Sequence, residues 1–364
     1  MTTQDLPTDS PILYVPNEMI ITGNRAREEL GAEAYDAEQK LQRLFTASKA
    51  EGPDRVPQFY LFLKVLKEYE NGDQSPLYPW LNSMPRYYSN GASMTDFCFG
   101  SLPPYAGQLA LTEKTRLSQF IMALSEVAFL SPETIENADL ARWAFAVVHT
   151  RYLDMPDGDI GLIPLADFFN HHGAETEAYI TFDEMGNCYA YSSYDVPAGQ
   201  PLRICYGDPT NQSKLLSRYG FLDESSAWTF CKIIINNPSQ ALVDMGYDHS
   251  TMLFGRDGDI SESVWDVLLY QELTRDRDQQ QAFYNAHMTG DFVSKQEFHQ
   301  QYFPLTLKAI QKHVNYFLIE LEELSENSWR KDIERHPRLP LIMAHNEFVK
   351  NTFERVQENL DNMG

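Results

Sequence analysis

The chain is poor in cysteine. Its 364 residues include four, Cys98, Cys188, Cys205 and Cys231, which lie far apart and form no Cys-x-x-Cys pair. This spacing indicates neither a zinc cluster nor a disulfide framework, and it fits a reducing, intracellular compartment. The sequence alone leaves open whether that compartment is the cytoplasm, the nucleus or a plastid.

Long apolar runs are also absent. No stretch approaches the roughly 20 consecutive apolar residues that a membrane-spanning helix needs. The segment from Met1 to Ser10 is polar and acidic, unlike the basic start and apolar run of a signal peptide. We therefore expect no membrane partner. A transit peptide would have to lie upstream of this sequence.

Basic residues are scarce relative to acidic ones. Lys and Arg number 29 against 52 Asp and Glu, which gives a formal net charge of -23. Such a charge repels a phosphate backbone and disfavours nucleic-acid binding. A protein partner with a basic segment matches it better. No Gly-rich phosphate loop, Gly-x-Ser-x-Gly motif or Cys/His catalytic pairing occurs in the sequence.

Large apolar side chains are plentiful. Hydrophobic residues make up 43% of the chain and aromatic residues 13%, including 21 Phe and 20 Tyr. This composition is typical of a globular protein. At this length we expect two domains, each able to bury its own core, and we expect a monomer.

Helical spacing dominates the first 150 residues after a single strand. The segment 11–16 reads as a strand closed by proline. From Glu38 to Glu70, apolar residues recur at steps of three and four, which predicts two helices broken at Gly52-Pro53. A proline-punctuated loop is expected at 75–80.

Two more helices are predicted before the pattern changes. They cover 112–129 and 132–152, and Ser131 followed by proline is a typical helix start for the second. Short β-rich runs separated by turns follow, at 178–182, 188–194, 202–205 and 228–235. From about 240 to the end the spacing is again helical.

One group of motifs indicates a functional site. The run 163–169, apolar except for Asp167, is followed by Asn170-His171. Tyr206 of Cys205-Tyr206-Gly207 lies 36 positions after Asn170, and Arg218-Tyr219-Gly220-Phe221 comes next. Taken singly, each motif is more often an ordinary turn or strand end, because Asn bonds its own backbone readily. Their order and spacing together are far more specific.

A metal centre is not expected at these motifs. His171 and His172 are adjacent, so their side chains point in different directions, and no third ligand has a convincing spacing. The Asp-Gly-Asp segments at 157–159 and 257–259 lack the further acidic ligands of a calcium loop and are predicted to be turns.

The combined motifs resemble the SET-domain protein methyltransferases, specifically the class of the Rubisco large-subunit lysine methyltransferase and the actin-histidine methyltransferases. The resemblance implies an α+β fold, with a SET-like core of short β-sheets, a helical insertion and an all-α C-terminal substrate-binding domain. We place the SET-like domain at 1–225, its insertion at about 35–155 and the helical domain at 226–364. A knot-like crossing near Asn170-His171 is also implied.

The same resemblance assigns roles to individual residues. S-adenosyl-L-methionine is the implied cofactor, and Tyr206 is expected to place its phenol beside the transferred methyl group and the acceptor nitrogen. Tyr219 is expected to line the acceptor channel. The expected cofactor-binding residues are Arg151, Asp167, Asn170, His171, Tyr206 and Phe221, with Arg151 near the cofactor carboxylate, where a planar cation suits bidentate binding.

The acceptor is expected to be a protein lysine, with histidine as the alternative. A lysine with a pKa near ~10.4 is almost entirely protonated at neutral pH, so the site must desolvate it or remove its proton. Apolar walls such as Phe168 and Phe169 would contribute to that. A histidine has a pKa near ~6.5 and needs less help. Tyr179 is a further candidate for the channel.

Relatives in this class begin with an Arg-Gly-x-Gly-like turn near the cofactor, and no such turn precedes the part matching Leu13-Tyr14-Val15-Pro16. Glycine there permits close backbone approach to a ligand. Either the sequence is truncated before this turn, or cofactor affinity is reduced or lost. A non-catalytic SET-like module that binds protein therefore stands as the alternative to an enzyme. The protein substrate and the degree of methylation cannot be read from the sequence.

Overall fold

The computed structural model describes residues 1–48, 55–173, 175–207, 210, 212–226, 228–230, 238–248, 251–329 and 333–364. These residues form two compact units that alternate along the chain. Unit 1 comprises Met1–Met94, Ala110–Gly207 and Ser217–Gly220, and unit 2 comprises Thr95–Leu109, Asp208–Leu216 and Phe221–Gly364. The domain boundary expected near 225 stays a prediction.

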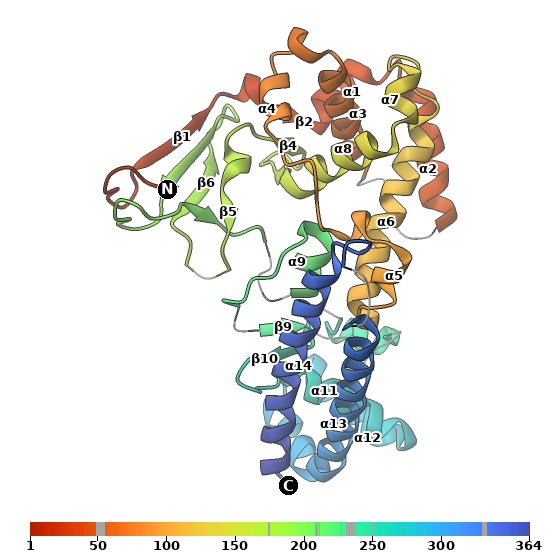
Figure 1. Cartoon of the computed structure of the whole chain (residues 1–364). Helices are drawn as coiled ribbons and strands as arrows, with labels where there is room; N and C mark the ends of the chain where they lie inside the picture. The colour runs from red at the N-terminus through yellow and green to blue at the C-terminus, as the bar shows by residue number, and fades with distance from the viewer. Residues whose placement is uncertain are drawn as a thin grey trace. The chain divides into compact units, whose positions relative to one another are not determined.

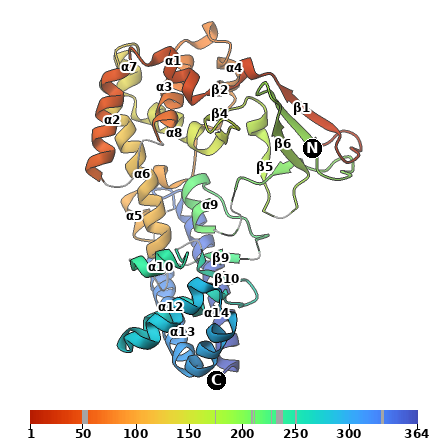
Figure 2. The ribbon, with the colours of Figure 1, turned by 180° about the vertical axis from the view of Figure 1, so that it is seen from behind.

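Unit 1 contains three small sheets. The largest is antiparallel and has the order β1 (Pro11–Val15), β7 (Cys188–Ser192), β6 (Ala178–Phe182). A second has the order β2 (Ile21–Thr22), β4 (Ile160–Leu162), β3 (Leu153–Asp154). The third pairs β5 (Asn170–His171) with β8 (Arg203–Ile204) in parallel. Figures 1 and 2 show β1 and β6 at the same end of this unit.

Helices occupy the other end of unit 1 (Figure 1). They are α1 (Gly23–Leu30), α2 (Tyr35–Ser48), α3 (Val56–Glu70), α4 (Tyr78–Asn82), most of α6 (Pro104–Leu124), α7 (Pro132–Glu136) and α8 (Ala138–Arg151). The core lies around α3, where Phe59 and Phe62 are fully buried and contact the ring of Phe120. Burying a Phe side chain contributes about 1.5–3 kcal/mol, so this cluster is a major source of stability.

Unit 2 is mainly helical, although the C-terminal region expected to be all-α also contains two short strands. It includes α5 (Asp96–Phe99), α10 (Gln240–Asp244), α11 (Glu262–Glu272), α12 (Arg277–Thr289), α13 (Phe292–Trp329) and α14 (Leu339–Asn362), and the larger part of α9 (Gln212–Tyr219). An antiparallel pair of short strands, β9 (Trp228–Phe230) and β10 (Leu253–Gly255), accompanies these helices. The two long helices α13 and α14 run side by side (Figures 1 and 2).

Most of the expected elements are present, and the α+β class is confirmed. The strand at 11–16, the two helices before Glu70 and the strands at 178–182 and 188–194 all form. The helix break expected at Gly52-Pro53, the end of the run 228–235 and Cys231 lie outside the described residues.

Two local expectations were wrong. The segment 75–80 is only partly a loop, since α4 begins at Tyr78. Pro79 lies in the first turn of this helix, where a backbone N–H has no partner within the helix, so its absence costs no hydrogen bond. The helix expected at 132–152 is two helices. Ser131 caps the first as predicted, accepting from the Thr134 N–H, and Asn137 caps the second by accepting from the Leu140 N–H.

Two neighbouring side chains on α14 hold the early segments of unit 2 in place. His345 is fully buried, and its Nε2 lies 3.0 Å from Ser213 Oγ on α9. Asn346 donates to the carbonyl of Ser101 at 2.8 Å. These hydrogen bonds join parts of the chain that are more than 100 residues apart but belong to the same unit.

None of the helices in the described part of the chain is both long and apolar enough to span a membrane. The described residues likewise contain no group of three or more His, Cys, Asp or Glu side chains that could hold a metal ion. Both turns expected from the Asp-Gly-Asp segments form, with Gly158 and Gly258 at positive φ.

Stability should fall in mild acid because of His345. Burial lowers the pKa of this histidine from 6.5 to about 4, so the unfolded chain binds its proton more tightly than the folded chain does. Above pH 6.5 this histidine does not change the free energy of unfolding. As the pH falls from 6.5 to 4, it should lower the free energy of unfolding by about 3 kcal/mol. Chemical denaturation at several pH values would measure it.

The variant His345→Gln should flatten that part of the pH dependence, whatever its effect at neutral pH. His172→Gln, at a partly exposed position in unit 1, serves as the control and should leave the slope unchanged. An unaltered slope in His345→Gln would show that this histidine is not the group that titrates.

Candidate active site

A pair of parallel strands brings the two central motifs together. In β5 and β8, Asn170 lies opposite Arg203 and His171 lies opposite Ile204. The Tyr206 backbone N–H then donates to His171 Nδ1 at 3.1 Å, and the Tyr206 phenol donates to the carbonyl of Phe169 at 2.5 Å. Residues more than 30 positions apart in sequence thus share one short hydrogen-bonded unit.

Tyr219, at the end of α9, completes this arrangement. Its phenol donates to the backbone carbonyl of Tyr206 at 3.1 Å, and the two ring centroids are 5.2 Å apart. Tyr206 is therefore held by its N–H, its carbonyl and its hydroxyl. The two tyrosines expected to be catalytic are neighbours.

A cavity of about 340 Å³ opens beside these tyrosines. Its volume falls in the usual range for sites that bind small molecules. The lining residues all belong to unit 1 and are Thr150, Arg151, Tyr152, Leu153, Asp154, Ala166, Asp167, Phe169, Ile180, Phe182, Ile204, Cys205, Tyr206, Gly207, Arg218 and Tyr219. Aromatic, aliphatic and charged side chains thus meet in one cavity.

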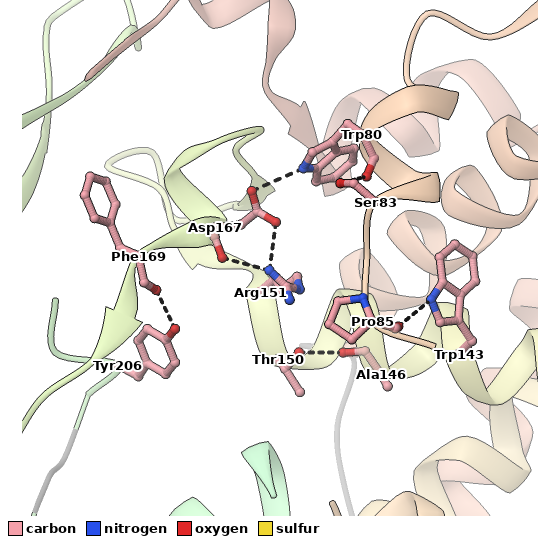
Figure 3. A network of polar contacts seen from close by, with 10 residues as sticks. All are labelled: Trp80, Ser83, Pro85, Trp143, Ala146, Thr150, Arg151, Asp167, Phe169 and Tyr206. Atoms are coloured by element: carbon pink, nitrogen blue, oxygen red, sulfur yellow. Dashed lines mark hydrogen bonds and ion pairs between the residues drawn. The ribbon is translucent and has the colours of Figure 1, made fainter. Parts of the chain in front are cut away.

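Arg151 and Asp167 form an ion pair at the cavity wall (Figure 3). One guanidinium nitrogen of Arg151 donates to the Asp167 carbonyl at 2.8 Å and to its carboxylate at 3.0 Å, and Trp80 donates to the other carboxylate oxygen at 3.2 Å. Burial raises the pKa of Asp167, while Arg151 and Trp80 act in the opposite direction. The pair fixes the guanidinium in the cavity.

Arg151 retains a donor for a further acceptor. Its Nε is buried and has no hydrogen-bond partner among the described residues. An unpaired buried N–H costs about 1–3 kcal/mol, so a carboxylate ligand at this point would be favoured. This observation fits the expected position of the carboxylate of S-adenosyl-L-methionine.

The backbone just before Asp167 is strained. Leu165 has φ +72°, a value that is costly for a residue with a Cβ, and its side chain is 55% exposed. Such conformations cost about 1–3 kcal/mol and tend to occur at functional sites. Leu165 immediately precedes the short 3₁₀ helix Ala166–Phe168, which carries Asp167.

Both tyrosines are neutral hydrogen-bond donors at ordinary pH. Burial raises the pKa of Tyr206 to about 12. Burial also raises the pKa of Tyr219, against the lowering effect of the nearby Arg218. Neither phenol is therefore available as an anionic base near neutrality, and both keep their hydrogen-bond geometry.

Arg218 holds the ring of Tyr219. Its Nε donates to the carbonyl of His149 at 3.2 Å, and its guanidinium carbon lies 4.7 Å from the Tyr152 ring centroid and 5.0 Å from that of Tyr219. A guanidinium over aromatic faces is attractive by cation–π interaction. Sequence reasoning assigned no role to Arg218, Tyr152 or Trp80, although Arg218 precedes Tyr219 directly in the motif.

Among the described residues, the other three residues predicted to bind the cofactor are not part of the cavity lining. Asn170 is exposed, and His171 contacts the ring and backbone of Tyr206. Phe221 belongs to unit 2. Of the two predicted apolar walls, Phe169 lines the cavity, whereas Phe168 is 49% exposed. The cofactor roles of the first three stay predictions.

Tyr179 does not face the cavity. It alternates along β6 with Ile180 and Phe182, which do line it. The Tyr179 phenol instead donates to Asp9 at 3.1 Å on the other side of the sheet. The structure therefore does not bring this residue, a candidate for the channel, together with Tyr206 and Tyr219.

The fold is that of the SET-domain protein methyltransferases of the Rubisco LSMT class. The structure of Rubisco LSMT bound to sinefungin and monomethyllysine matches with a TM-score of 0.65 at 16% identity, over 99% of this chain and 84% of that chain. The SET domain of LSMT bound to lysine and AdoHcy matches with a TM-score of 0.64 at 15% identity, over 99% and 83%.

In sequence, the chain is similar to actin-histidine N-methyltransferases. The zebrafish protein (Danio rerio) is 25% identical over 245 residues, which is 64% of this chain and 38% of the relative. The protein of Otolemur garnettii is 26% identical over 237 residues, or 62% and 38%. The match thus spans less than half the length of these curated relatives. No family model matches the chain.

Gly220 should be essential for the position of Tyr219. Its φ is +80°, and a Cβ there would lie 2.7 Å from the Asn90 nitrogen and the Ser89 carbonyl carbon. Gly220→Ala should therefore combine backbone strain with a clash against a backbone that cannot easily move, and it should cost about 3 kcal/mol or more.

Gly199→Ala is the matched control. Gly199 has a similar φ of +83°, and no atom lies within 4 Å of the place that a Cβ would take, so it should lose only about 1–2 kcal/mol. Urea denaturation of both variants would measure the difference. Equal losses would mean that the approach of Ser89 and Asn90 does not constrain residue 220.

Proposed function

We propose that the chain is an S-adenosyl-L-methionine-dependent protein N-methyltransferase. The observation that carries the proposal is the joint arrangement of Tyr206, Tyr219 and Arg151 around one cavity in a fold of the SET class. Structures of that fold are described with AdoHcy or AdoMet bound, and the similar sequences are named as N-methyltransferases. The alternative, a protein-binding module without catalysis, does not account for this cavity and the residues that line it.

The cofactor would supply an electrophilic methyl group on a sulfonium. Arg151 would bind its carboxylate through the free Nε, and the Asp167 ion pair would keep that guanidinium oriented. The parts of the pocket formed by Asn170 and His171 would contribute backbone and side-chain contacts. This assignment follows the family resemblance of the motif and the position of the two residues beside Tyr206.

The tyrosines would orient the acceptor nitrogen. Tyr206 and Tyr219 are neutral and hydrogen-bonded, so their oxygens are fixed and can accept from an acceptor N–H. The apolar side chains of Phe169, Ile180 and Phe182 would exclude water. Exclusion of water lowers the pKa of a lysine ammonium and favours the neutral, nucleophilic amine.

We propose lysine as the acceptor, with histidine as the second candidate. The matching structures contain lysine or monomethyllysine, which favours the first. The relatives that match in sequence are named as actin-histidine enzymes, which favours the second. A neutral imidazole also needs no deprotonation at pH 7.

Calorimetric titration with S-adenosyl-L-methionine tests the cofactor site. Saturable binding is expected, and Arg151→Met should weaken it by about 10- to 100-fold, the loss expected for a charge-assisted hydrogen bond to a carboxylate. Arg142→Met is the control, since Arg142 lies on the same helix but pairs with the exposed Asp139. Absence of heat up to millimolar ligand would refute the enzyme proposal for this chain.

Methyl transfer to proteins tests the activity itself. Incubation with a lysate and labelled cofactor, followed by mass spectrometry, should identify methylated lysine, or methylated histidine if the second candidate is right. Tyr206→Phe should lower the rate about 100-fold, because a positioned hydroxyl is removed. Its stability should fall by only about 1 kcal/mol, since the Tyr206 backbone contacts remain.

Tyr194→Phe, at an exposed tyrosine of the same unit, should leave the rate unchanged. If Tyr206→Phe retained at least half of the wild-type rate, the role assigned to this phenol would be wrong. Retained cofactor binding in the same variant would separate a catalytic defect from a damaged pocket.

A further inference from the structure

Four tyrosines form a continuous row across the sheet of strands β1, β7 and β6 in unit 1. We call this row the tyrosine face; it consists of Tyr14 on β1, Tyr189 and Tyr191 on β7, and Tyr179 on β6. Tyr14 pairs with Tyr189 across the strands, and Tyr179 pairs with Tyr191. Successive ring centroids are 5.0, 6.1 and 5.8 Å apart.

The tyrosine face is on the outside of the sheet. The intervening residues Val15, Cys188 and Ala190 are buried on the opposite side, where Ile180 and Phe182 line the cavity. Tyr14 is 55% exposed and Tyr179 is 40% exposed. The outer face of an antiparallel sheet is usually polar, and contiguous exposed aromatic residues commonly mark an interaction site.

The surroundings of the tyrosine face are acidic. Tyr179 donates to Asp9, and Tyr189 donates to Asp183 at 3.3 Å. Hydrogen bonds, first from the Asn187 side chain, lower the pKa of Asp183, so it stays ionised. Each of these phenol oxygens is therefore next to a carboxylate.

The segments that build this sheet supply no Lys or Arg side chain. Residues 1–24 and 152–202 contain no Lys or Arg, whereas they contain acidic residues throughout. Arg203, directly after the second segment, is ion-paired with Glu177. Arg25, after the first segment, donates to the carbonyl and side chain of Asn17. The face thus combines aromatic rings, whose π-surfaces attract cations, with an excess of acidic over basic side chains.

We propose that the tyrosine face docks a basic segment of a protein partner, with Arg or Lys side chains over the rings and their charged ends near Asp9 and Asp183. A nucleic acid would be repelled by these carboxylates. A purely apolar partner would bury the phenols and carboxylates without satisfying them. A cationic side chain satisfies both requirements.

This surface is separate from the proposed methyl-transfer cavity, because the sheet lies between them. Docking at the tyrosine face does not require methyl transfer, so the docking proposal can be tested whether or not the chain is an enzyme. If both sites operate, a partner bound through the tyrosine face would contact the chain at two places.

Titration with a hexa-arginine peptide near 150 mM salt tests the proposal, since that salt screens long-range attraction to the acidic chain. The double variant Tyr14→Ser/Tyr179→Ser removes two exposed rings and no charge. It should bind about tenfold more weakly, as expected for the loss of two exposed cation–π contacts. Tyr87→Ser/Tyr316→Ser removes two other exposed tyrosines, 90% and 64% exposed, and should bind like the wild type.

Should the serine variant unfold, Tyr14→Leu/Tyr179→Leu keeps the apolar area while removing the ring faces, and it should show the same loss. Equal affinity of wild type and folded ring-deletion variants would overturn the proposal, because the net charge alone would then explain binding. Absence of hexa-arginine binding to the wild type would also overturn the docking proposal. Binding of a neutral oligosaccharide such as cellohexaose, without binding of hexa-arginine, would overturn it too.

Discussion

The parallel pairing of β5 with β8 is the contact on which the site depends. It sets Asn170 and His171 beside the segment that continues into Tyr206, and from there His171 and Phe169 hold the tyrosine by its backbone and its hydroxyl. Tyr219 then donates to the backbone carbonyl of Tyr206. Since each strand is only two residues long, side chains rather than a long ladder keep the pairing in register.

Local patterns in the sequence were enough to predict much of the fold. The alternation at 178–182 and 188–194 gives the strands of a hairpin, and three- and four-residue spacing gives the long helices. The errors have local causes that compete with those patterns. Proline is common in loops but also in the first turn of a helix, as at Pro79. Asn137 caps a new helix within a segment whose spacing suggests one continuous helix.

The sequence named several residues that the structure places at one cavity, but it did not give their arrangement. The motif identified the tyrosines and Arg151, which do meet at one cavity. It could not show that Trp80 and Arg218 support them, because these contacts join residues far apart in sequence or depend on the orientation of side chains. Tyr179 illustrates the same limit: one position along a strand decides which side of a sheet a residue occupies.

Of the hydrogen bonds described above for Tyr206, those to His171 and from Tyr219 use its main chain, which every amino acid other than proline can supply in full. The architecture around this position can therefore survive replacement of the side chain. In evolutionary terms, a lineage could lose or alter the chemistry at residue 206 and still inherit the fold intact. Descendants with the same shape and different activities, or none, are a natural outcome of building a reactive residue into the frame through its backbone.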